Sequence, residues 1–300
     1  MSFPATLNPP EGILSAEEVF EVLEFSRGLM SMLEPMILDG GRLIHASMDD
    51  VSTSEHGGMS AVVGYVAHTP EWHKFNYRWM ISLLQLQHPA LHTAKDVSSF
   101  PLIGGSGLTD EDVFIILSPF IAMVQEELIQ RGAFSICVVT EHAGYDRLTE
   151  KEKKFIRPPD INSFEIACAY ALKCVSNPLN PRNCIAIQMD ESQSAPKLYE
   201  SYQNMKRKDA ILKSGFGSIC FCDDIHHPPI QAADLLGNVT VRGWRNWKLG
   251  KEWPKAFKEL VFSDGKPNLR IQVYDYAALK ELARIRMAAS EKMAMLSEST

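Results

Sequence analysis

The chain has 300 residues, of which 45% are hydrophobic and 22% are charged, so it has enough apolar side chains for the core of one large domain or two small ones. Its formal net charge of −7 excludes a uniformly basic nucleic-acid-binding protein, and contact with a polyanion would need a local basic patch. No apolar run reaches the length of a membrane span, and residues 1–10 lack the features of a secretory signal.

The six cysteines are spread along the chain, with no CxxC pair and a single CxC pair at Cys220 and Cys222. This usage is typical of reduced, mostly buried thiols, so we expect a cytoplasmic protein. Cys220 and Cys222 would lie on the same face of a strand and could hold a soft metal. A zinc site is nevertheless not predicted, because no second cysteine pair completes it.

The first elements are a helix and a pair of strands. A capping box at residues 15–18 opens an amphipathic helix within the first forty residues. A turn precedes an alternating strand at residues 42–48, which ends in Asp49-Asp50, and residues 59–68 form a second strand. The two strands make a plausible antiparallel hairpin with a loose loop.

Helices and strands are then mixed along the rest of the chain. Helices are expected at about 70–87, 163–175 and 197–209, from a cap at 109–112 through about 130, from 230, shortly after Gly250, and at the C-terminus. Strands are expected at 133–140, 184–189, 216–222 and 270–274. Gly104–Gly107 lacks the lysine of a phosphate-binding loop and is interpreted as a flexible linker. The mixture predicts an α/β fold.

Three aspartates occupy positions that could converge. Asp49 ends the first strand, Asp190 ends the fourth, and Asp234 borders the buried stripe of the helix after the fifth. Converging carboxylates repel one another unless divalent cations lie between them, and Mg²⁺ and Mn²⁺ prefer such oxygen ligands. Bound ions of this kind can activate water for phosphodiester cleavage. Each aspartate also has an alternative without metal: Asp49 could begin a polar hairpin loop, Asp190 could cap a helix after its strand, and Asp234 could form a surface ion pair.

Several short stretches of the sequence, which together span roughly residues 42–247, resemble the domain of unknown function 3800 family. The resemblance rests on Asp49-Asp50, residues 91–96, Asp190 and above all the Gln-x-Ala-Asp helix at residues 230–237. That family is similar to ribonuclease H-like folds, a mixed sheet flanked by helices with acidic residues proposed to bind divalent metal. We therefore expect one domain over residues 1–300. Its parts are a helical extension at 1–40, a ribonuclease H-like core at 41–248 and a strand and helix addition at 249–300.

The resemblance also implies a set of site residues. The implied catalytic residues are Asp49, Asp190, Asp234, His92 and Lys95. Of these, the three aspartates would bind Mg²⁺ or Mn²⁺ together with Asp50, while His92 and Lys95 would contact phosphate or orient water. Asp50 stands where the family usually has Glu, and Val51-Ser52 replaces a common Ser-Gly. The residues at the predicted end of the first strand therefore depart from the family pattern.

Basic and aromatic side chains alternate in residues 242–248, directly after the Asp234 helix. Arg242 and Arg245 share a helical face and could follow a phosphate backbone, while Trp244 or Trp247 stacks on a base. The alternative is that the tryptophans belong to the core and the cations to a solvated rim.

The residues and the resemblance together predict a divalent-metal-dependent nuclease or phosphodiesterase that acts on nucleic acid through metal-activated water. The alternative is a non-catalytic interaction or accessory protein that retains the ribonuclease H-like fold. The altered first-strand motif and the acidic net charge favour this second hypothesis.

Overall fold

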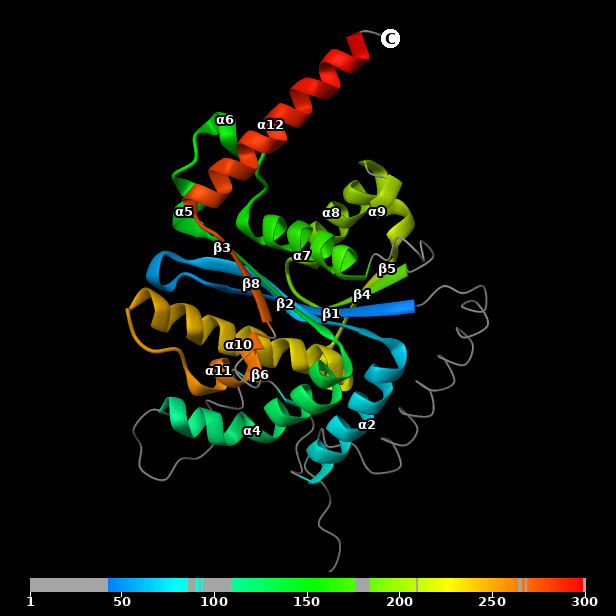
Figure 1. Cartoon of the computed structure of the whole chain (residues 1–300), viewed down its shortest axis with the longest axis vertical. Helices are drawn as coiled ribbons and strands as arrows, with labels where there is room; N and C mark the ends of the chain where they lie inside the picture. The colour runs from blue at the N-terminus through cyan, green and yellow to red at the C-terminus, as the bar shows by residue number, and fades with distance from the viewer. Residues whose placement is uncertain are drawn as a thin grey trace, which may run out of the picture.

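The computed structural model describes residues 43–85, 90–91, 93, 109–175, 184–208, 210–263, 266–267 and 269–298. These residues form a six-stranded mixed sheet with helices on both faces (Figure 1). The predicted α/β class is therefore confirmed. The helix predicted in the first forty residues and the linker at Gly104–Gly107 lie outside the described residues.

The main sheet combines antiparallel and parallel pairs. Its strands are β1 (Leu43–Thr53), β2 (Met59–His68), β3 (Phe134–Glu141), β4 (Cys184–Asp190), β5 (Phe216–Cys222) and β8 (Leu269–Tyr274). Their order across the sheet is β5-β4-β1-β2-β3-β8. The β1/β2 and β2/β3 pairs are antiparallel, whereas β1/β4, β4/β5 and β3/β8 are parallel. Consequently β1, β4 and β5 end at the same edge of the sheet.

The helices divide between the two faces of the sheet (Figure 1). One face is covered by α2 (Thr69–Gln85), α4 (Asp110–Glu127), α10 (Pro228–Lys248) and α11 (Lys255–Val261). The other is covered by α7 (Pro159–Val175), α8 (Ala195–Lys208) and α9 (Ala210–Gly215). The C-terminal helix α12 (Tyr276–Glu298) projects away from the sheet in Figure 1. None of the helices within the described residues is both long and apolar enough to cross a membrane.

The predicted hairpin is confirmed, but its first strand is longer than expected. β1 pairs with β2 as far as the Thr53 and Met59 register, so Asp49 and Asp50 lie within the strand and do not end it. The ladder continues because β2 is buried along nearly its whole length and supplies partners for the polar end of β1. The connection is reduced to five residues, in which Gly57 and Gly58 adopt positive φ values.

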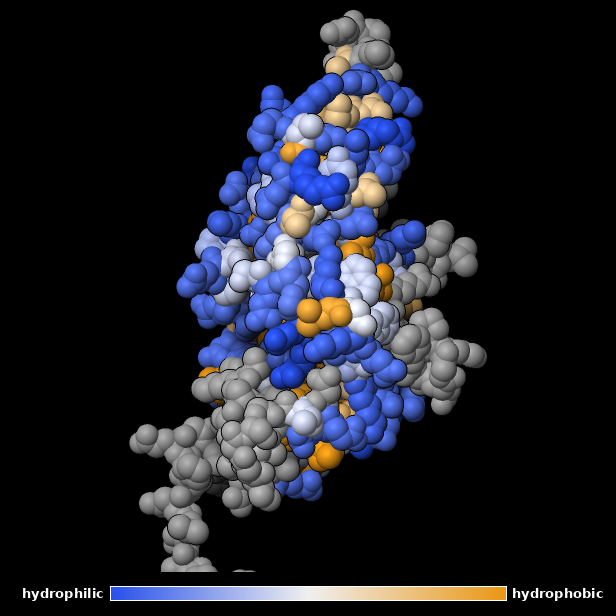
Figure 2. Space-filling model, turned by 90° about the vertical axis from the view of Figure 1, so that its left-hand side faces the viewer, coloured by the Kyte–Doolittle hydropathy of each residue, from blue (hydrophilic) through white to orange (hydrophobic). Residues whose placement is uncertain are grey.

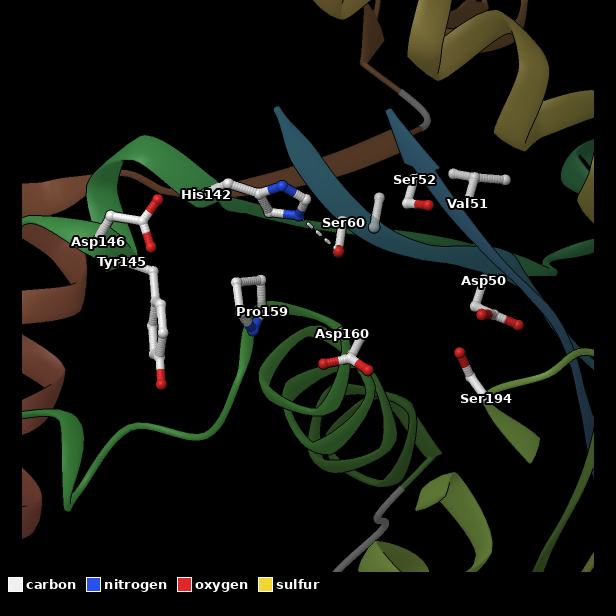
Figure 3. A pocket seen from close by; sticks show the side chains of 11 residues that line it. Asp50, Val51, Ser52, Ser60, His142, Tyr145, Asp146, Pro159, Asp160 and Ser194 are labelled. Carbon is white, nitrogen blue, oxygen red and sulfur yellow. Dashed lines mark hydrogen bonds between the residues drawn. The ribbon is translucent and has the colours of Figure 1, made fainter. Parts of the chain in front are cut away.

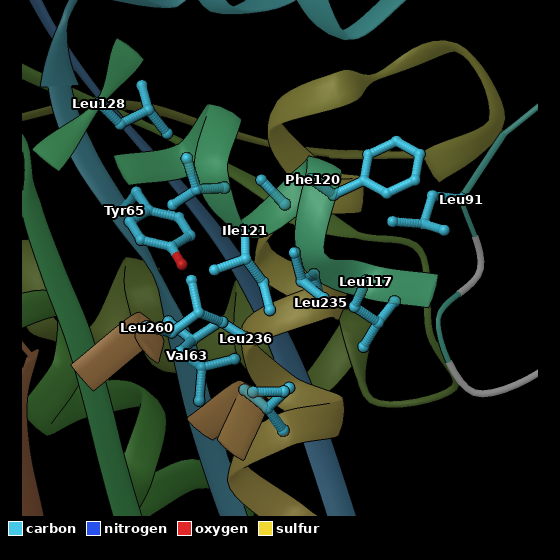
Figure 4. Packing of buried hydrophobic residues seen from close by; sticks show 14 of the residues in the cluster. Val63, Tyr65, Leu91, Leu117, Phe120, Ile121, Leu128, Leu235, Leu236 and Leu260 are labelled. Atoms are coloured by element: carbon cyan, nitrogen blue, oxygen red, sulfur yellow. The ribbon is translucent and has the colours of Figure 1, made fainter. Parts of the chain in front are cut away.

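The alternation of β1 sends neighbouring side chains to opposite faces. Met48 lies in the core beneath α7 and α8, together with Met189 of β4. Val51 instead packs toward the core beneath α10, which Figure 4 shows with residues from β2, α4, α10 and α11. Because the period of a strand is two residues, Asp49 shares the α10 face and Asp50 shares the α7 face.

Two short helices lie between β3 and α7, where the sequence predicts neither a helix nor a strand. They are α5 (His142–Asp146) and α6 (Glu150–Lys153), which precede α7. Thr149 and Glu152 form a complete capping box for α6. Helices this short contain too few turns to show an apolar period, so local capping and not periodicity indicates them.

The remaining elements of the described chain are short. They are the two-stranded hairpin of β6 (Phe262–Ser263) and β7 (Lys266–Pro267) and the 3-10 helices at Glu55–Gly57, Ile129–Arg131 and Asp224–His226. Figure 2 shows a side face of the molecule on which the coloured residues are mainly hydrophilic and the apolar ones are scattered. Among the residues coloured there, no broad apolar patch is visible on this face.

Candidate metal centre

Asp49 and Asp190 lie side by side on neighbouring parallel strands. Met48 and Met189 are the last registered partners of β1 and β4, so the two aspartates occupy the next positions. Met48 and Met189 both point into the α7 core, and the residue after each therefore points toward α10. Register and alternation thus bring together two carboxylates that are 141 positions apart in the sequence.

Asp234 completes the trio from α10. The backbone N–H of Thr93 donates a hydrogen bond of 2.7 Å to Asp234 Oδ2. Three residues further along α10, a Cβ on Gly237 would lie only 3.2 Å from Asp49 Oδ2. Residues three apart share a helix face, so Asp234 is directed toward the same end of β1. The three predicted aspartates are thus brought to one side of the sheet.

The electrostatics of the trio reflect this convergence. Burial raises the pKa of Asp49 well above its usual value, and the charges of Asp234 and Asp190 raise it further. Asp49 is only 5% exposed. The pKa of Asp190 rises from 3.8 to about 6 because of partial burial, with Asp234 adding to the rise and the backbone N–H of Glu191 opposing it. Both carboxyl groups therefore lose their protons at higher pH than an ordinary aspartate does.

We expect Asp190→Asn to stabilise the metal-free protein at pH 7 but not at pH 4. An acid whose folded pKa is raised from 3.8 to about 6 contributes stability below the lower value and loses it as pH rises through the upper one. A shift of this size corresponds to about 3 kcal/mol, which half-exposure reduces to about 1–2 kcal/mol. Urea unfolding of variant and wild type at the two pH values measures the difference.

Asp112→Asn is the control of opposite sign for this experiment. Asp112 accepts hydrogen bonds from Thr109 at the start of α4, which lower the pKa of its carboxyl group. Its stabilising contribution is present above the unfolded pKa and is lost on acidification. The Asp112 variant should therefore lose stability at pH 7, and a pH-independent difference for Asp190→Asn would contradict the expectation.

A buried glutamine fixes the chain around Asp234. Gln231 is 0% exposed, and its Oε1 accepts hydrogen bonds from Trp79 Nε1 at 2.7 Å and Leu91 N at 3.1 Å. Its Nε2 donates to the carbonyl oxygens of Asp224 and Ile225 at 2.8 and 3.2 Å. Gln231 therefore holds the backbone N–H of Leu91, and Asp234 holds that of Thr93. The sequence contains this glutamine in its most specific block, but gives no signal of what it binds.

Gly237 permits the close approach of α10 to β1. A Cβ at this position would lie 2.6 Å from Val51 Cγ1, a contact that requires a shift of the helix or the strand. We expect Gly237→Ala to destabilise the protein by about 1–2 kcal/mol, because overpacking outweighs the gain of about 1 kcal/mol in helix propensity. Adding Val51→Ala should recover most of the loss in a double-mutant cycle measured by urea unfolding. Additive effects of the two changes would contradict the steric explanation.

The three aspartates act on one another electrostatically, but their side chains are not arranged as a complete set of metal ligands. Within the described ranges, no group of three or more His, Cys, Asp or Glu side chains is arranged to hold a metal ion. One local feature nevertheless fits a cation with oxygen ligands. Thr93 is fully buried, and its Oγ1 has no hydrogen-bond partner among the described groups although its N–H contacts Asp234. A buried hydroxyl oxygen without a partner is suited to a water or an ion nearby.

Asp50, predicted as a further metal ligand, lies on the opposite face of the sheet from the trio. It lines a pocket of about 440 Å³ beside Asp160 at the start of α7 and Ser194 before α8 (Figure 3). Burial raises the pKa of Asp50, and hydrogen bonds from Ser192 and Ser194 partly offset this effect. The strand period separates Asp50 from Asp49, so the structure does not unite all four aspartates.

The basic and aromatic segment forms the second half of α10. Trp244 is 5% exposed and belongs to the core, so the predicted base stacking by Trp244 is wrong, whereas Trp247 is 48% exposed. Arg242 Nε donates to Asn238 Oδ1 at 3.0 Å, and Arg245 lies 3.6 Å from a carboxylate oxygen of Glu55. The alternative of a core tryptophan thus holds for Trp244. His92 and Lys95 lie outside the described residues.

Comparisons with known proteins find no match for this chain. The chain matches no family model, no curated protein and no solved structure. The resemblance to the domain of unknown function 3800 family therefore stays a prediction, supported by the residues that carry it.

Proposed function

We propose that the protein is a divalent-metal-dependent nuclease or phosphodiesterase in which Asp49, Asp190 and Asp234 hold Mg²⁺ or Mn²⁺. The observation that carries the proposal is the mutual electrostatic coupling of the three carboxylates on one side of the sheet. In the described part of the chain, neither Asp49 nor Asp190 has a lysine or arginine among the groups that shift its pKa. A divalent cation would relieve this repulsion.

The fold supports the same assignment. A mixed sheet with helices on both faces and acidic residues side by side on two adjacent parallel strands is consistent with what the resemblance to ribonuclease H-like folds implies. The third acid comes from α10, whose Gln231 binds the carbonyl oxygen of Asp224 before the helix, the backbone N–H of Leu91 and the indole of Trp79. Three separate parts of the chain thus support one candidate site.

The different environments of the site residues would give them different roles in the reaction. A bound Mg²⁺ or Mn²⁺ supplies Lewis acidity, which makes water a better nucleophile and offsets charge on a phosphodiester. Asp49 is almost fully buried and would serve as a fixed ligand. Asp190 is only partly buried and would bind the ion from its solvent-accessible side. The Thr93 N–H holds Asp234 in place.

A polar stripe on α10 supports a polynucleotide substrate. Asp234, Asn238, Arg242 and Arg245 follow one another at helical spacings of four, four and three residues. At about 1.5 Å per residue, Arg245 lies about 16 Å along the helix from Asp234. A chain of phosphates that leaves the metal site along this stripe would therefore meet Arg242 and then Arg245, which would exchange Glu55 for phosphate.

Calorimetric titration with Mn²⁺ and a cleavage assay test the proposal together. The wild-type protein should bind Mn²⁺ saturably, and Asp234→Ala should abolish the heat. A panel of single- and double-stranded DNA and RNA should contain at least one polymer that is cut only when Mn²⁺ or Mg²⁺ is present. Saturable nucleic-acid binding with neither Mn²⁺ heat nor cleavage would overturn the enzyme proposal and favour the accessory protein.

A further inference from the structure

The edge of the sheet carries a pair of thiols that the proposed nuclease does not use. β5 is the last strand on its side of the sheet, and Cys220 and Cys222 stand two residues apart on it. Ile219 and Phe221, between and beside them, pack into the α7 core, so both cysteines point to the opposite face. Cys220 is exposed and Cys222 is half-buried, and both are free thiols. The pair is therefore accessible from outside the molecule.

The two sulfurs are held close together and are linked to the neighbouring strand. The Cys220 and Cys222 thiols share a hydrogen bond, which lowers the pKa of Cys220 and raises the pKa of Cys222. Their sulfurs lie 3.7 and 3.6 Å from the carbonyl oxygens of Ile187 and Met189, respectively. Gln188 Nε2 donates to Cys222 Sγ at 3.0 Å and contacts His227 Nδ1 at 3.1 Å. One strand edge thus positions two soft donor atoms.

A disulfide is a poor use of this geometry. Two residues of a strand span about 6.6 Å, whereas disulfide-bonded Cα atoms are usually about 4.4–6.8 Å apart with a mode near 5.5–6 Å. The span lies near the upper end of this range, so closing an S–S bond of about 2.03–2.05 Å would pull on an edge strand that is paired with β4 over the same residues. A cation between the two sulfurs does not require them to approach that closely.

We propose that Cys220 and Cys222 form a two-sulfur site for a soft monovalent d¹⁰ cation, the class that contains Cu⁺ and Ag⁺. Thiolates select soft ions, and such ions accept two ligands, whereas Zn²⁺ requires about four. In the residues that the structure describes, no third His, Cys, Asp or Glu joins the pair in a metal-binding group. Each thiol that coordinates the ion releases its proton to solvent, and no electron is transferred.

Surrounding charges favour a cation at this position. Asp190 lies opposite Cys222 in the β4/β5 register, and its charge acts on that thiol. Asp223, the next residue along the chain, acts on Asp190 in turn. The hard carboxylate centre and the soft thiol pair are therefore neighbours with different metal preferences. The thiol site does not depend on the nuclease proposal.

The test is an anaerobic competition between the reduced full-length protein and bicinchoninate for Cu⁺. One equivalent per chain should leave the chelator, and Cu X-ray absorption should show two sulfur ligands. Cys220→Ser and Cys222→Ser should each weaken binding by about 100-fold or more, because each removes one arm of a chelate. Cys184→Ser is the matched control, since Cys184 is a half-buried thiol on the adjacent strand, and it should bind Cu⁺ like wild type.

Alkylation of the wild-type protein gives a second readout that does not depend on the folding of a variant. One equivalent of Cu⁺ should protect Cys220 and Cys222, but not Cys184, from iodoacetamide, as measured by mass spectrometry. Wild-type affinity in either single variant, or a loss of binding in Cys184→Ser, would overturn the proposal. Unchanged alkylation of both Cys220 and Cys222 in the presence of Cu⁺ would also overturn it. Loss of Mn²⁺-dependent cleavage would not affect these outcomes.

Discussion

Gln231→Met should lower the free energy of unfolding by about 3 kcal/mol or more, because it leaves several buried polar groups without partners. Methionine has a similar length and flexibility, so the change creates little cavity. It removes the acceptor of Trp79 Nε1 and Leu91 N and the donor to the Asp224 carbonyl. Each buried group left unpaired costs about 1–3 kcal/mol. Relaxation of the surrounding structure keeps the total loss below the sum of these separate costs. Urea unfolding followed by fluorescence measures the loss.

Gln125→Met is the matched control for Gln231. Gln125 on α4 also donates a side-chain hydrogen bond, to the carbonyl oxygen of Glu259, but it lies in a solvent-accessible setting. Its replacement should change stability by no more than about 0.5 kcal/mol, because water can satisfy the groups that it leaves. Equal effects of the two substitutions would show that the Gln231 interactions do not stabilise the fold in the way that their burial implies.

Much of the α/β fold was predictable from local patterns, and the exceptions have identifiable causes. β2 and β5 match their predicted bounds because polar or glycine-containing turns flank β-rich runs. β1 extends five residues beyond its predicted end because its polar half is held by pairing with β2, which single-strand patterns do not reveal. α10 begins at the prolines but continues as one helix through Lys248, so the basic and aromatic segment belongs to it.

The site was predictable in its residues but not in its geometry. Apolar strand runs that end in an aspartate predict Asp49 and Asp190, and the parallel register of β1 and β4 aligns the two residues. The one-residue alternation that sends Asp50 to the other face follows from the strand continuing past Asp49. The sequence placed both aspartates at a strand end, where a turn would have allowed them to point together. Long-range contacts such as Thr93 with Asp234 have no local signal at all.

The structure also separates two acidic environments that the sequence treats as one. Asp49 and Asp190 face α10, whereas Asp50 and Asp160 face each other across the pocket in Figure 3. The charge of Asp160 acts on Asp50, and the charge of Asp234 acts on Asp49 and Asp190, although the charge of Asp50 also reaches both of these residues. Substitutions in the two environments should therefore have different consequences if only one of them binds the catalytic ion.

Asp190→Asn and Asp234→Asn should each lower metal-dependent cleavage by about 100- to 1,000-fold, the usual effect of removing one electrostatic contributor to a transition state. Asparagine preserves the shape and one oxygen but removes the negative charge that a divalent cation requires. The loss should appear in kcat, with Mn²⁺ affinity reduced in the same variants. Initial rates at several Mn²⁺ concentrations separate weak metal binding from loss of chemistry, because excess metal restores only the former.

Asp160→Asn is the control that assigns the effect to the trio. Asp160 has the same side chain and lies on the same sheet-and-helix scaffold, but on the α7 face beside Asp50. Its replacement should leave the cleavage rate and Mn²⁺ affinity within about a factor of two of wild type, as for a substitution outside the site. Equal losses in Asp160→Asn and Asp190→Asn would move the metal to the α7 pocket. Full activity in Asp190→Asn with folding intact would remove the catalytic role of the α10-side carboxylates altogether.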